Sequence, residues 1–373
     1  MVTIKEVSTA KELKTFIYLA EKIHQNHKNW LPPLYLDEEK FFSHKRNPAF
    51  QHADTILFLA YLGEQAVGRI MGIIPHQYNR KNGVESVRFS YFECYEDELV
   101  FKELLLAVER WGKSKNCTEI IGPMGFSDKE PQGFLNQGFT EPTMLITNCS
   151  FEYMKIFIEK AGFESFVRLY QYQVPLTENV LERYQKFTQR VEARQNINVH
   201  EFTRTGQVRP FIAGVFELIN NSYKDIYGFL PVTKKETEEF ANRFLPLLNP
   251  KLIKIICDLS GKVIAFVIAM PDLSEGIRKA KGRLLPLGWF HILQASRKSK
   301  KLMLLLGAIA PEMQNKGLDA VLATKLFTSA LTLGFQEIDS HLIMEKNLKM
   351  RSEIERLPNH KLYKEYTIYK KSI

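Results

Sequence analysis

The residues best suited to chemistry lie in one stretch, 302–339. The apolar run LMLLLGAIA comes first, a short segment with Gln314 and Gly317 follows, and a helical pattern of leucines begins after it. This spacing predicts a strand, a tight loop and a helix. Backbone N–H groups of such a loop can turn toward one point, and the positive end of the helix favours an anion there. The predicted pyrophosphate site consists of Gln314, Asn315, Lys316, Gly317 and Leu318.

On these residues alone, a loop that only turns the chain is an alternative. The loop also resembles motif A of the GCN5-related N-acetyltransferase superfamily, which has a Gln or Arg, two residues, a Gly, one residue and a Gly or Ala. Gln314 and Gly317 match this motif, whereas Asp319 occupies the second small position, where a carboxylate is unfavourable beside a pyrophosphate. The resemblance implies acetyl-CoA or another acyl-CoA as co-substrate, without a metal. It also implies that the pantetheine arm lies against Ala308 and Ile309.

Candidate catalytic residues follow the fifth predicted strand of the same region. Glu345 and Asn347 resemble the superfamily's Glu, one residue, Asn signature, in which the Asn lies close to the acyl arm of the cofactor. The next helix normally supplies a tyrosine that protonates the leaving thiolate, but Ile354 occupies about that position. The candidate acids are therefore Tyr363, Tyr366, His341 and His291. Members of this superfamily often use a glutamate or a water chain as base, so the resemblance makes Glu345 the candidate base. The alternatives are a solvated Glu345 and a Tyr363 that only packs in a terminal strand.

The segment 122–150 is rich in Gly and Pro and is longer than most connections in compact domains. Segments of this kind are often binding loops or lids. If it folds toward the C-terminal domain, Asn136, Gln137 and Asn148 line the acceptor pocket. A surface excursion without a binding role is the alternative.

Metal-ligating residue types are present without a complete ligand set. His24 and His27 can share a helix face at i, i+3, but the sequence shows no third ligand, so we expect solvated histidines and no metal. The cysteines lack CxxC spacing, which argues against a disulfide framework or a zinc motif. We therefore interpret them as small core residues: Cys94, Cys117, Cys149 and Cys257.

The predicted elements occur twice in the same order. A hairpin turn at Gly63 returns at Gly261, and each hairpin is followed by a strand, a helix and a further strand. With the resemblance, this order predicts an α/β protein of two tandem acetyltransferase-like domains, each a mixed, mostly antiparallel sheet flanked by helices. We expect an N-terminal domain of residues 1–176, a linking helix over 177–195 and a C-terminal domain of residues 196–373 that carries the acyl-CoA site.

The first copy is predicted to lack a cofactor site. Its loop between strand and helix has no glycine and no nearby cation, and it contains Glu93, Glu96, Asp97 and Glu98. Carboxylates at a helix N-terminus satisfy the helix dipole themselves and repel a pyrophosphate. A structural or substrate-covering domain is the expected role.

Composition limits the class of protein. The net charge of +9 comes from Lys and Arg residues that are spread along the chain, so nucleic-acid binding is not expected. No apolar run approaches the roughly 18 residues that span a bilayer, and the N-terminus lacks a signal-peptide core. We expect a cytoplasmic protein without a membrane span, and the sequence does not predict its oligomeric state.

The predicted function is acyl transfer, most simply of an acetyl group, to an amine of a small molecule or peptide by direct attack on the thioester. One alternative is an aminoacyl or long-chain acyl transferase of the same fold, in which the apolar segment 284–293 lines an acyl tunnel; this segment can equally be core. Another alternative is a non-catalytic protein that binds coenzyme A or another ligand, which Asp319 and Ile354 favour.

Overall fold

The computed structural model describes residues 1–194, 196–245 and 248–373. Its contacts group the chain into two compact units, which are described separately. Unit 1 consists of Met1–Tyr170, Leu273–Ala295 and Tyr363–Ile373, and unit 2 consists of Gln171–Asp272 and Ser296–Leu362.

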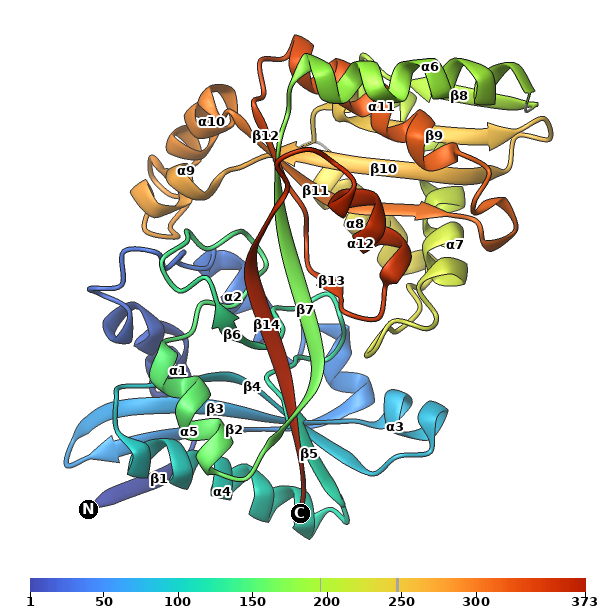
Figure 1. Ribbon diagram of the computed structural model, residues 1–373. Coiled ribbons are helices and arrows are strands. Elements are labelled where there is room, and N and C mark those ends of the chain that lie inside the picture. The colour runs from blue at the N-terminus through green and yellow to red at the C-terminus, as the bar shows by residue number, and fades with distance from the viewer. Residues whose placement is uncertain (195, 246–247) are drawn as a thin grey trace. The chain divides into compact units, whose positions relative to one another are not determined.

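Unit 1 contains a mixed sheet, whose strands Figure 1 draws mainly in blue and teal. In spatial order its strands are β1 (Val2–Glu6), β2 (Ala53–Leu62), β3 (Gln65–Pro75), β4 (Ser86–Cys94), β5 (Glu119–Gly122) and β14 (Lys361–Ser372). The neighbours β4 and β5 are parallel, whereas the other neighbouring pairs are antiparallel. The short strand β6 (Phe134–Gln137) also pairs with β14. The predicted hairpin around Gly63 is confirmed as β2 and β3.

Helices cover both faces of this sheet. Successive side chains of a strand point to opposite faces, so Leu59 lies in the core under α1 (Ala10–Ile23) and Ala60 in the core under α4 (Glu98–Ser114). The spacing of apolar residues predicts a helix from Lys5 to about Lys28, but α1 begins only at Ala10 and ends at Ile23. Lys5 and Glu6 instead form the end of β1, which pairs with β2. The other helices that begin in unit 1 are α2 (Tyr35–Phe41), α3 (His76–Asn82), α5 (Glu152–Lys160), α9 (Ser274–Lys279) and α10 (Gly288–Lys298).

Unit 2 repeats this strand order. Its strands are β8 (Ile197–Glu201), β9 (Ile253–Asp258), β10 (Val263–Pro271), β11 (Lys301–Ile309), β12 (Glu337–Asp339) and the end of β7 (Glu164–Pro175). Here β11 and β12 are the parallel pair. A two-residue strand, β13 (Ile343–Met344), pairs with β7. The helices are α6 (Glu178–Arg194), α7 (Ile212–Ser222), α8 (Lys234–Phe244), α11 (Leu318–Thr332) and α12 (Leu348–Glu355).

Each sheet is completed by a strand from the other half of the sequence. In unit 1 the C-terminal strand β14 pairs with β5, and in unit 2 the last residues of β7 pair with β12. The predicted domains, 1–176 and 196–373, are each contiguous in sequence and do not include this exchange of strands. Their bounds stay a prediction. The predicted linking helix is α6, which packs on α11 of unit 2, where Thr188 donates to the carbonyl of Ala320 at 3.1 Å.

A buried ionic cluster ties α1 to the sheet of unit 1. The guanidinium of Arg69, on β3, donates to the carbonyls of Phe16 and Ile17 at 2.6 and 3.1 Å. It also contacts the carboxylate of Glu93 at 2.6 and 2.8 Å. Burial alone would raise the pKa of Glu93, but Arg69 and His24 together lower this pKa to about 2. Glu93 is therefore ionised in the folded protein over the whole neutral range.

Glu38, on α2, interacts electrostatically with Arg69 and Glu93, but its pKa is raised, not lowered. Its Oε2 atom is buried, and its Oε1 atom accepts a hydrogen bond from the Tyr91 hydroxyl at 3.2 Å. Burial raises the pKa of Glu38 to about 7, although Arg69 acts to lower it. The folded state thus holds a proton on Glu38 at pH values where the unfolded chain has lost it.

We expect Glu38→Gln to stabilise the protein above neutral pH. Because the folded pKa is raised from about 4.5 to about 7, ionisation of Glu38 removes stability as the pH rises through that window. At pH 8 the variant should gain on the order of 2 kcal/mol in free energy of unfolding, and at pH 4.5 almost none. Urea unfolding at both pH values measures this difference. The control Glu64→Gln, in the exposed hairpin turn, should show no such gain, and an equal gain there would contradict the assignment.

Candidate acyl-CoA site

The predicted strand, loop and helix are confirmed in unit 2. Strand β11 ends at Ile309, a short 3-10 turn covers Pro311–Met313, and α11 begins at Leu318. The loop between them uses the left-handed region twice, with φ of 61° at Asn315 and 83° at Gly317. Glycine adopts this conformation without strain, and asparagine tolerates it better than most residues. The sequence of the loop therefore fits its backbone.

The N-termini of α11 and α4 differ at the point where a phosphate would bind. The N-cap residue of α11 is Gly317, which has no side chain to accept from the first N–H groups of the helix. The N-cap of α4 is Asp97, whose carboxylate accepts from the N–H groups of Leu99 and Val100 at 2.9 and 3.1 Å. Free N–H groups at a helix start attract anions, whereas a capping carboxylate already occupies that position.

Charged side chains surround the α11 loop. The ammonium of Lys349, on α12, donates to the side-chain oxygen of Gln314 at 2.6 Å, and Lys316 is exposed in the loop itself. Asp319 lies in the first turn of α11. Burial and then the Asp319 carboxylate raise the pKa of Glu353, which also pairs with Arg356 at 2.9 Å. The Asp319 carboxylate, which follows the predicted phosphate-binding residues, thus interacts with Glu353 of α12.

Strand β11 pairs along only part of one edge. It is parallel to β12 at Lys301–Met303, and β12 itself has only three residues. On its other edge β11 pairs with β10 as far as Ile309. The residues after Met303 therefore have backbone groups on the β12 side that this short strand does not reach.

The hydrogen-bond pattern between β11 and β10 shows which residues of β11 direct their backbone groups away from β10. The N–H of Ala310 donates to the carbonyl of Ile264, so polar groups of alternate residues on β11 point toward β10. The groups of Gly307 and Ile309 consequently point to the opposite edge. At Gly307 this edge is bridged by the Tyr223 hydroxyl, which donates to the carbonyl at 2.9 Å and lies 3.4 Å from the N–H.

Comparison with solved structures identifies this architecture. A tandem GNAT protein from the clavulanic acid biosynthesis pathway matches all of this chain and 98% of its own, with a TM-score of 0.57 and 10% identity. A GCN5-related N-acetyltransferase from Sphaerobacter thermophilus matches all of this chain and 95% of its own, with a TM-score of 0.51 and 8% identity. The chain has the fold of the tandem GCN5-related N-acetyltransferases. The predicted fold class is therefore confirmed.

Two curated relatives align with nearly the whole of this GNAT-fold chain. Bacterial ceramide synthase from Caulobacter vibrioides is 27% identical over 381 residues, which cover 98% of this chain and 96% of the relative. Protein YghO from Escherichia coli is 26% identical, with 97% and 93% covered. No model of a protein family matches the chain.

Within the GNAT fold, the predicted pantetheine and acyl-arm residues are all found in unit 2. Ile309 directs its backbone polar groups to the open edge of β11, whereas those of Ala308 lie in the β10 ladder. Asn347 is the N-cap of α12 and accepts from the Met350 N–H at 3.2 Å. The carbonyl of Glu345 accepts from Arg351 at 3.0 Å. A pair that the sequence did not indicate, Lys349 and Gln314, connects α12 to the loop.

The other predicted site residues belong to unit 1. Tyr363 lies in β14 and is only 4% exposed. Asn136 donates to the carboxylate of Glu365 at 2.8 Å, and Asn148 donates to the carbonyl of Gly133 at 2.7 Å. Gln137 is exposed at the end of β6. The two asparagines thus support the Gly and Pro rich segment, and their predicted role in binding an acceptor remains a prediction.

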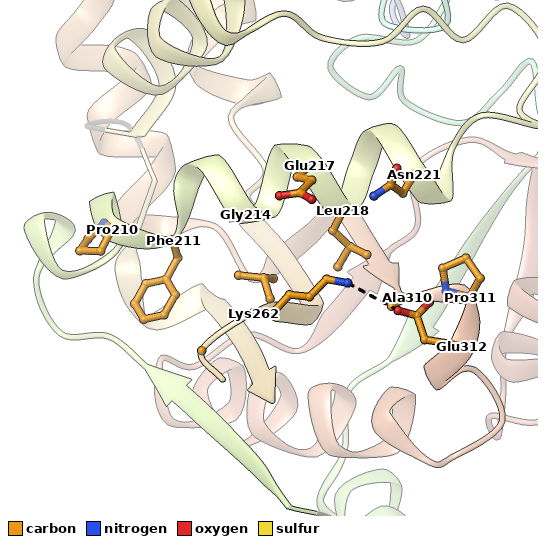
Figure 2. Close-up of a pocket in the computed structure, with 12 residues that line it drawn as sticks. Pro210, Phe211, Gly214, Glu217, Leu218, Asn221, Lys262, Ala310, Pro311 and Glu312 are labelled. Atoms are coloured by element: carbon orange, nitrogen blue, oxygen red, sulfur yellow. Dashed lines mark ion pairs between the residues drawn. The ribbon is translucent and has the colours of Figure 1, made fainter. Parts of the chain in front are cut away.

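Unit 2 has a pocket of about 390 Å³ beside the loop, between α7 and the β9–β10 turn. Figure 2 shows Lys262 pointing toward Glu312, with an ion-pair distance of 3.8 Å, and Glu217 on the opposite wall. Its lining reaches Ala310 and Pro311 but not the predicted phosphate-binding residues. With two carboxylates and one cation, this pocket is poorly suited to a pyrophosphate.

Three expectations about unit 1 were wrong. The acidic loop of the first copy does have a nearby cation, because Arg69 pairs with Glu93. His24 is not solvated but is only 2% exposed. The apolar segment 284–293 is not core, since its large side chains from Leu285 to Leu293 lie mostly on the surface. Pattern alone could not separate these cases, since burial depends on what packs against each segment.

Among the residues that the structure describes, no helix combines the length and apolar composition needed to cross a bilayer.

The left-handed conformation of Gly317 can be tested directly. We expect Gly317→Ala to lower the free energy of unfolding by about 1 kcal/mol, because a Cβ is disfavoured at this φ. Gly317→Asn should cost less. Gly206→Ala is the matched control, since φ is not in this region there and an added Cβ would meet nothing within 4 Å. Urea unfolding measures all three, and equal effects at positions 317 and 206 would refute the strained-turn explanation.

Proposed function

We propose that this protein transfers a long-chain acyl group from an acyl thioester, such as an acyl-CoA, to the amino group of a long-chain amino alcohol. The observation that carries the proposal is the full-length alignment with a bacterial ceramide synthase. A ceramide is by definition the fatty amide of such an amino alcohol. Transfer of an acetyl group to a small or peptide amine, the simpler expectation from sequence, becomes the rival.

The α11 loop supports the location of the donor. Its N-terminal N–H groups have no capping side chain, and Lys316 and Lys349 lie at the loop. Both features favour a pyrophosphate at Gln314 to Leu318. In contrast, Asp97 occupies the corresponding position of α4. We therefore place the donor in unit 2.

The residues of unit 2 suit direct attack by the amine. Only the free amine is nucleophilic, so a base must first take a proton from the ammonium group. The new N–C bond then forms as the C–S bond breaks, and the leaving thiolate takes up a proton. Negative charge develops on the thioester oxygen, and in this proposal the outward N–H group of Ile309 on β11 donates to it. Glu345 remains the proposed base, and the proton that leaves the nitrogen as the amide forms goes to the thiolate.

An exposed apolar surface in unit 1 supports a lipid substrate. Its members are between 42% and 74% exposed and comprise Leu285, Leu287, Trp289, Phe290 and Leu293. On α10, Trp289, Phe290 and Leu293 share one face by their i, i+3 and i, i+4 spacing. The last turn of the same helix carries Arg297 and Lys298. Aromatic and aliphatic side chains beside cations are typical of helices that lie on an anionic bilayer.

The substrate proposal predicts a chain-length preference. With a long-chain amino alcohol, purified protein should form amide from palmitoyl-CoA at least tenfold faster than from acetyl-CoA, because only the long chain supplies apolar binding energy. Mass spectrometry of the amide and release of free thiol measure this. Gly317→Glu should abolish both by placing a carboxylate in the phosphate site, whereas Gly206→Glu should not.

Equal rates with acetyl-CoA and short amines would favour the acetyltransferase rival. Binding of coenzyme A without any amide formation would favour a non-catalytic binding protein. Full activity of Gly317→Glu would contradict the proposed location of the donor at the α11 loop.

The surface on α10 predicts binding to anionic vesicles. The double variant Trp289→Asp, Phe290→Asp should lower the fraction of protein that sediments with phosphatidylglycerol vesicles at least tenfold, because it removes apolar contact and adds negative charge. Leu259→Asp is a matched control, since Leu259 is 69% exposed but lies in the β9–β10 turn of unit 2. Equal sedimentation of all three proteins would contradict a membrane role for α10.

A further inference from the structure

Two histidines near the end of α1 and a cysteine 122 residues further along the chain lie close together in unit 1. The Nδ1 atoms of His24 and His27 lie 3.0 Å apart, and the Sγ atom of Cys149 lies 3.8 Å from both ring nitrogens of His27. One ligand atom from each residue can be chosen so that all lie within 4.8 Å of one another. Ligand atoms around a tetrahedral metal are separated by between about 3 and 4 Å, as follows from bond lengths of about 2.0 Å to nitrogen and 2.3 Å to sulfur.

The rings are held in this arrangement by aromatic stacking. His24 stacks on Trp30 and on Phe151, with ring centroids 5.1 and 4.8 Å away and an interplanar angle of 5° in each pair. Phe151 also stacks on His27 at 4.5 Å. Side chains fixed in this way lose little freedom when a metal binds, which is a requirement for a preorganised site.

The second ring nitrogen of His24, Nε2, faces a carboxylate, as is common for histidines that bind metals. This atom lies 3.4 Å from the carboxylate of Glu93. A histidine ligand commonly donates its second N–H to a carboxylate, which directs the other nitrogen toward the metal. Arg69 holds Glu93 in place through contacts of 2.6 and 2.8 Å.

From this geometry we propose that His24, His27 and Cys149 bind a zinc ion, with Glu93 as a positioning residue behind His24. Two imidazoles and a thiolate favour Zn²⁺ over Mg²⁺ or Ca²⁺, which prefer oxygen ligands. Three protein ligands leave a fourth position for water or another ligand. The ion would clamp the end of α1 to the Gly and Pro rich segment that carries Cys149.

Two nearby cationic side chains oppose a metal cation. Lys364 is 1% exposed, donates to the carbonyl of Pro142, and acts electrostatically on both His27 and Cys149. Arg278 acts electrostatically on Cys149. A thiolate ligand offsets this repulsion, because zinc binds cysteine in its deprotonated form. The proposal therefore depends on Cys149 more than on either histidine.

The test is metal binding by the full-length protein. Protein stripped with a chelator and dialysed against zinc should retain about one ion per chain by elemental analysis. Reconstitution with Co²⁺ should give the intense d–d bands of a tetrahedral site and a thiolate-to-cobalt charge-transfer band. Cys149→Ser should lose the charge-transfer band, whereas Cys117→Ser, which alters another buried cysteine of unit 1, should keep it. Glu93→Gln should weaken zinc binding by 10- to 100-fold.

Circular dichroism of each variant shows whether it is folded, and the unaltered protein gives a result that does not depend on any variant. Absence of zinc and of cobalt bands in folded, unaltered protein would overturn the proposal, as would a charge-transfer band that persists in Cys149→Ser. These measurements do not involve acyl transfer, so they can fail or succeed independently of the proposed reaction.

Discussion

The proposed donor site depends on backbone hydrogen-bonding groups that have no partner strand. In unit 2 the pairing of β11 with β12 covers only Lys301–Met303, and α11 starts at a glycine that offers no cap. N–H and C=O groups without a partner in the sheet or helix are available to a ligand at the end of β11 and at the start of α11. The Tyr223 hydroxyl bridges the N–H and C=O groups of Gly307. Any ligand arm that follows the edge of β11 must compete with that hydroxyl.

The two units show how one strand order can carry different electrostatics. Their sheets have the same succession of antiparallel and parallel pairs, yet α4 starts with a capping aspartate and α11 with a left-handed glycine. A carboxylate cap stabilises a helix by roughly 1 kcal/mol, and it excludes a phosphate from the same position. Stability was thus favoured at one helix start, while the other kept its N–H groups available.

Local features were predictable from sequence, and long-range pairs were not. Gln314, Gly317 and the start of α11 follow from a glycine between an apolar run and a helical pattern, because all the determining residues lie within one short segment. The bridge from Tyr223 to Gly307 joins residues 84 apart, and the contact of His27 with Cys149 joins residues 122 apart. No spacing rule connects such positions. The exchange of β7 and β14 escaped prediction for the same reason, since each is an ordinary strand by its own pattern.

The polar interior of unit 1 argues against a purely structural role for the first copy. Burying a charge is costly unless it is paired, and apolar residues of similar size usually fill such space at lower cost. Unit 1 nevertheless buries Arg69 with Glu93, and it buries Arg88 against the carbonyls of Gly125 and Phe126. The second of these holds the Gly and Pro rich segment that also carries Cys149. These ionic groups therefore gather around the same segment and the same end of α1 that carry the proposed metal ligands.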